Sequence, residues 1–110
     1  MGMTTVEPDF EGAHFFADQA RADTWVVTVI GEVDLANRER FEAVVERALL
    51  ASPSKLVFDL AGVRFMDSSG LGVLLMAANK ADSVEVRTPS PGIRRLIEIS
   101  GLTELFRIVE

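Results

Sequence analysis

The side chains best suited to chemistry form one short run, in which Asp67, Ser68 and Ser69 stand directly before Gly70. An apolar, helix-like sequence begins at Leu71. The free amides at the start of a helix donate hydrogen bonds to a capping side-chain oxygen, and the positive end of the helix dipole tolerates added negative charge. The residues leave two interpretations open: both serines only cap the helix, or one of the two hydroxyls, which exceed what a single cap requires, is available to carry a phosphate.

Strand-like and helix-like segments alternate around this run. The β-branched segment Thr24–Ile30 predicts a strand that pairs with Ala13–Gln19 as an antiparallel hairpin, and Lys55–Leu60 predicts a buried central strand. Apolar residues at helical spacing predict helices over Leu35–Leu50 and from about Ser69 to Ala81.

A last strand, Ser83–Thr88, is expected to expose Glu85 and Arg87 to water, and Ser90 with Pro91 predicts the start of a third helix. The order β-β-α-β-α-β-α implies right-handed crossovers. We therefore expect an α/β fold with a small mixed, largely parallel β-sheet and an N-terminal hairpin, packed with helices. Residues 1–11 lack periodicity and are expected to be a flexible lead-in to a single domain over 12–110.

Composition excludes several function classes. A net charge of −6 argues against nucleic acid as a partner, and the absence of cysteine excludes disulfides and zinc ribbons. The longest apolar run, Val73 to Ala78, is far shorter than the ~20 residues of a membrane helix. These features predict a soluble, cytoplasmic protein that binds neither nucleic acid nor membrane.

Catalysis is not expected. Met66 stands where a nucleophile elbow before Ser68 would need glycine, and His14, the only histidine, lies far away on the predicted hairpin. The chain has no phosphate-binding loop motif and no metal-ligand cluster. We predict that the protein is not an enzyme and holds no metal or cofactor, although a nucleotide-binding or hydrolytic module remains an alternative.

Two carboxylates have two interpretations each. Asp67 suits either a turn or capping role beside free amides or a role in recognition. Asp34 suits either the cap of the first helix, for which Asn37 is the other candidate, or a role in recognition. In parallel βα units the loops after Val33 and after Leu60 reach the same end of the sheet. Asp34 and Ser68 are therefore expected to share one surface.

The segment Phe65–Val73 resembles the signature of STAS domains of the anti-sigma-factor antagonist family. Gly31–Leu35 upstream, and Ser90–Leu96 with Ser100–Leu102 downstream, are similar to further segments of that family in the same order. The resemblance implies a regulatory switch that is phosphorylated on Ser68.

In that reading the unphosphorylated protein binds an anti-sigma factor serine/threonine kinase, a GHKL-type ATPase, and so releases a sigma factor. A PP2C-type phosphatase is the implied partner that reverses the modification. The alternative is a non-switching STAS subunit of a stress-signalling scaffold or of an ABC-type lipid transport complex. Ser69 is expected to act chiefly as the cap, and the implied partner-binding residues are Asp34, Asp67, Ser69, Gly70, Leu71 and Gly72.

Overall fold

A five-stranded mixed sheet forms the centre of the molecule, with its strands in the order β1-β2-β3-β4-β5. In the computed structural model, which describes residues 12–110, β1 (Ala13–Arg21) runs antiparallel to β2 (Thr24–Val33). Parallel pairing then adds β3 (Lys55–Met66), β4 (Ser83–Arg87) and β5 (Arg107–Val109). The expected α/β fold with an N-terminal hairpin is confirmed, whereas the expected lead-in lies outside the described residues.

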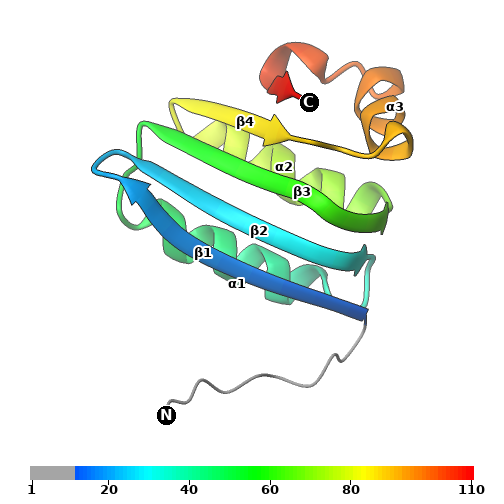
Figure 1. The fold of residues 1–110 in the computed structure, drawn as a ribbon, viewed down its shortest axis with the longest axis horizontal. Coiled ribbons are helices and arrows are strands. Elements are labelled where there is room, and N and C mark those ends of the chain that lie inside the picture. Colours follow the sequence, from blue (N-terminus) through cyan, green and yellow to red (C-terminus); the bar gives the residue numbers. More distant parts are fainter. Residues whose placement is uncertain (1–11) are drawn as a thin grey trace.

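As the alternating pattern predicts, α-helices connect the parallel strands. α1 (Arg38–Leu49) and α2 (Ser68–Lys80) lie side by side on one face of the sheet (Figure 1). α3 (Pro91–Ile99) follows β4, and a short 3-10 turn, η2 (Thr103–Leu105), leads into β5. None of the helices in the described part of the chain is both long and apolar enough to cross a membrane.

The core lies between the sheet and the helical layer. Phe41 of α1 stacks on Phe15 of β1 with ring centroids 5.1 Å apart, and it meets Phe58 of β3 edge-on at 5.9 Å. Burial of one such side chain stabilises a fold by about 1.5–3 kcal/mol. The inward-facing apolar residues of β2, β3, β4 and α2 complete this cluster, which includes Val27, Val29, Leu56, Leu60, Leu74, Ala77, Val84 and Val86.

β2 and β3 extend further than their sequence pattern predicts. The expected ends at Ile30 and Leu60 are too early, because the pairing continues through irregularities to Val33 and Met66. Gly31 has a φ of 104°, which only glycine adopts readily, and this allows β2 to bend without ending. The extension brings the site-bearing loops to the end of two paired strands.

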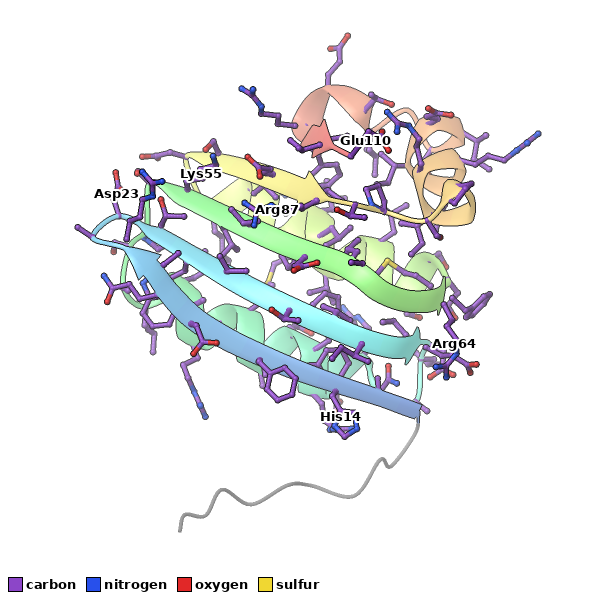
Figure 2. The ribbon with its side chains drawn as sticks, viewed as in Figure 1. His14, Asp23, Lys55, Arg64, Arg87 and Glu110 are labelled. Carbon is purple, nitrogen blue, oxygen red and sulfur yellow. The ribbon has the colours of Figure 1, made fainter. Side chains whose placement is uncertain are left out.

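The sheet face opposite the helices carries a charge cluster that corrects one prediction. Glu85 was expected to face water, but it is only 6% exposed. The Lys55 Nζ lies 2.9 Å from its Oε1, and the Arg87 Nη2 lies 3.1 Å from its Oε2. Lys55 and Arg87 are labelled over this face in Figure 2. Hydrogen bonding to Lys55, and secondarily to Arg87, holds the pKa of Glu85 below its ordinary value of 4.5, against the opposing effect of burial.

This cluster predicts a loss of stability in acid. Because the folded-state pKa of Glu85 is lowered, its contribution is complete above about pH 4.5 and disappears as the pH falls through the folded pKa. Glu85→Gln should therefore lower the free energy of unfolding near neutral pH and flatten its decline in acid. Urea denaturation between pH 7 and pH 3 measures both effects. Glu46→Gln, at an exposed position on α1, should leave the slope unchanged.

Candidate functional site

The site is assembled where β2 and β3 end side by side. Val33 pairs with Met66, and the backbone N–H of Asp67 donates to the Val33 carbonyl at 3.1 Å. Asp34 and Asp67 each follow one of these two paired residues. The loop after β2 and the start of α2 therefore lie against one another, which confirms that they share one end of the sheet (Figure 1).

Asp67 is the residue that caps α2. Its Oδ1 accepts a hydrogen bond from the Ser69 N–H at 2.8 Å, and its carbonyl accepts from Gly70 at 3.1 Å and Leu71 at 3.3 Å. The prediction that Ser69 is chiefly the cap is therefore wrong, because the helix begins one residue earlier, at Ser68. A carboxylate at this position also complements the positive end of the helix dipole.

Capping by Asp67 leaves both serine hydroxyls outside the cap. Ser68 is the first residue of α2 and is exposed, whereas Ser69 is half-buried. In the part of the chain that the structure describes, neither hydroxyl hydrogen-bonds to another group. Ser68 is thus the more exposed of the two serines.

The three residues after the serines divide into buried and exposed positions. Gly70 is buried, and a Cβ there would lie 2.6 Å from the Met66 Cγ and 2.9 Å from the Val33 Cγ1. Leu71 is only 6% exposed and belongs to the core. Gly72 is exposed, with open space where a Cβ would be. Gly70 and Leu71 therefore hold α2 against the strand ends, while Gly72 contributes to the surface beside Ser68.

Hydrogen bonds of the Asn37 side chain order the loop that carries Asp34. The buried Asn37 amide donates to the Glu32 carbonyl at 2.8 Å, and its Oδ1 accepts the Asp34 N–H at 3.1 Å. The Asp34 Oδ1 accepts from the Ala36 N–H at 3.0 Å, which closes a tight turn. Of the two candidates for the α1 cap, Asn37 occupies that position, and its side chain orders the preceding loop. Asp34 is left half-buried at the surface.

One site residue was missed from sequence. Leu75 is half-buried and lies seven positions after Ser68, so it shares a helical face with Ser68 and Gly72. The apolar run of α2 contains more apolar residues than one buried helical face needs. The sequence pattern does not show which of them lie at the surface. His14 lies on the edge strand β1, two strands from β3, and its ring stacks on Phe16 with centroids 6.4 Å apart. No cluster of three or more potential metal ligands occurs among the described residues.

Comparison with known proteins identifies the family. The family profile described as "Mlab, STAS domain" matches residues 16–110, which is most of the chain. The chain belongs to the STAS domain family. It is also similar to the anti-sigma F factor antagonist of Lysinibacillus sphaericus, with 32% identity over 94 residues that cover 81% of this chain and 80% of the relative.

Two mycobacterial proteins extend the similarity of this STAS domain. The anti-sigma-F factor antagonist RsfB of Mycobacterium tuberculosis is 33% identical over 86 residues, which cover 76% of this chain and 70% of RsfB. The crystal structure of an anti-sigma factor antagonist from Mycobacterium paratuberculosis superposes with a TM-score of 0.81 at 28% identity. That superposition covers 96% of this chain and 90% of the mycobacterial protein.

The two glycines of α2 give opposite predictions for stability. Gly70→Ala should lower the free energy of unfolding by about 1–3 kcal/mol, the usual cost of overpacking, because the new methyl group would collide with Met66 and Val33. Gly72→Ala should raise it by about 0.5–1 kcal/mol, because alanine loses less backbone entropy in a helix. Urea denaturation of both variants makes the comparison. Equal effects would contradict the packing assigned to Gly70.

Proposed function

We propose that this STAS domain is an anti-sigma factor antagonist whose binding is switched off by phosphorylation of Ser68. The observation that carries the proposal is the exposed Ser68 hydroxyl, which Asp67 releases from capping at the start of α2. The anti-sigma factor antagonists among the bacterial relatives support the choice of partner. The role is one of binding rather than catalysis.

The unphosphorylated surface would receive an anti-sigma factor serine kinase of the GHKL type. Ser68, Gly72 and Leu75 supply its helical face, and Asp34 supplies a carboxylate from the neighbouring loop. A small, partly apolar surface of this kind suits contact with a folded partner. Binding would remove the anti-sigma factor from its sigma factor, and a PP2C-type phosphatase would restore the binding form after phosphorylation.

Electrostatics explains how a phosphate would act at this position. It adds a charge of about −1.5 to −2, next to the carboxylates of Asp34 and Asp67. A hundredfold loss of affinity needs only about 2.8 kcal/mol, which charge repulsion and phosphate desolvation at an interface can supply. Within the domain, the dipole of α2 would favour the phosphate by about 0.3–1 kcal/mol. The switch would therefore act on the surface and leave the fold intact.

The serines provide the first functional test. On incubation with a cognate anti-sigma factor kinase and ATP, Ser68→Ala should abolish phosphate incorporation and retain binding, whereas Ser69→Ala should still be phosphorylated. Ser68→Glu should weaken binding at least tenfold with a near-native melting temperature. Intact-mass spectrometry and isothermal titration calorimetry give these readouts. Phosphate located on Ser69, or full affinity in Ser68→Glu as in a non-switching STAS subunit, would contradict the proposal.

Asp34 provides the second test, because its structural and recognition roles separate in one substitution. Asparagine retains the oxygen that accepts the Ala36 N–H, so Asp34→Asn should change the free energy of unfolding by less than about 0.5 kcal/mol. Loss of the negative charge should nevertheless weaken binding to the kinase or slow phosphorylation. Unchanged affinity and phosphorylation kinetics would show that Asp34 serves only to close its turn.

A further inference from the structure

An apolar groove lies between the end of β3 and α3. It has a volume of about 270 Å³. Its buried lining includes Met66 and Ile93, and the half-buried Leu96 lies beside them. Phe65 and Ile99 also line it, and they are 51% and 74% exposed. Neither of these two side chains belongs to the core cluster, so their apolar surface is not used by the fold.

Two arginines give this groove a basic character on a chain with a net charge of −6. Arg64 and Arg95 both line it. The Arg64 Nη2 lies 3.6 Å from the Glu32 Oε2, in an ion pair whose side chains are both more than half exposed. Arg95 takes part in no ion pair among the described residues. A long, solvent-screened pair is weak, so both cations can be engaged by a ligand.

The first turn of α3 adds to the preference for negative charge. Ser90 and Gly92 line the groove where this helix begins, and the Ser90 Oγ caps it by accepting the Ile93 N–H at 3.3 Å. The positive end of the helix dipole therefore lies at the groove together with the two arginines. Figure 2 shows Arg64 at the end of the sheet opposite Asp23 and Lys55.

We propose that this groove docks an acidic segment of the protein partner that carries apolar anchor side chains. The apolar lining would receive the anchors, and Arg64 and Arg95 would pair with flanking carboxylates. The groove lies close to the start of α2, because the buried Met66 both lines the groove and packs against Gly70. The inference rests on the proposed function for the identity of the partner, but its test does not involve Ser68.

A second groove serves as an internal control. It lies at the carboxyl ends of α1 and α2, at the other end of the sheet, with a volume of about 520 Å³. Exposed Leu50 lines it together with Arg47 and Lys80. Glu46 also lines it and places an acid among these cations. Like the first groove it has two cations beside exposed apolar surface, but its apolar lining is smaller and it lies at the opposite end of the sheet from the serines.

The test measures fluorescence anisotropy with a labelled 12-residue peptide that carries four glutamates and has leucines at positions i, i+3, i+4 and i+7. A twin peptide replaces each glutamate with lysine. The wild-type protein should bind the acidic peptide at least tenfold more tightly than its twin. The double variant Arg64→Glu, Arg95→Glu should lose at least tenfold of that affinity, and Arg47→Glu, Lys80→Glu should stay within twofold. Circular dichroism melting verifies that both variants fold.

Three results would overturn the groove assignment: no binding of the acidic peptide, equal binding of the twin, or equal losses in the two double variants. Failure here is distinguishable from failure of the proposed function. If Ser68→Glu weakens binding to the anti-sigma factor but the protein does not distinguish the acidic peptide from its twin, the groove assignment is rejected and the proposed function is retained. If the protein prefers the acidic peptide but Ser68→Glu leaves the affinity for the anti-sigma factor unchanged, the groove assignment is retained and the switch is rejected.

Discussion

The site depends on the parallel pairing of β2 with β3, which ends in the Asp67 N–H to Val33 carbonyl bond of 3.1 Å. This bond fixes the first residue before α2 against the last residue before the Asp34 loop. Gly70 allows the helix to approach both strand ends, because any larger side chain would meet Met66 and Val33. A carboxylate loop and an exposed serine thereby become neighbours, although they are more than thirty residues apart in the sequence.

The proposed switch rests on the separate roles of Asp67, which caps α2, and Ser68, which is exposed beside it. The carboxylate meets the need of α2 for a cap, so the serine hydroxyl has no structural bond that modification would break. Because the two tasks belong to different residues, a phosphate on Ser68 would alter the surface while the helix terminus keeps its hydrogen bond.

The sheet face that the helices leave uncovered carries a buried carboxylate between two cations. Glu85 lies between Lys55 and Arg87, whose side chains cover it and leave it 6% exposed. Burial by itself disfavours the charged form of a carboxyl group, and the two cations with their hydrogen bonds keep Glu85 ionised. The same residue therefore links the integrity of the central strands to pH at a place remote from the serines.

Sequence by itself determined the α/β class, the hairpin and the helix that starts at the serines, because apolar periodicity and capping chemistry are local. Local patterns also indicated that Asp34 and Ser68 would share a surface, since parallel crossovers leave few alternatives. Only the tertiary structure decided which residue caps α2, where β2 and β3 end, and that Glu85 is buried. The cap was undecided because Asp67, Ser68 and Ser69 all suit that position, whereas the strand ends and the burial of Glu85 depend on contacts between elements distant in sequence, which no local pattern encodes. The groove beside Phe65 and Ile99 is likewise tertiary, because it exists only where β3 and α3 meet.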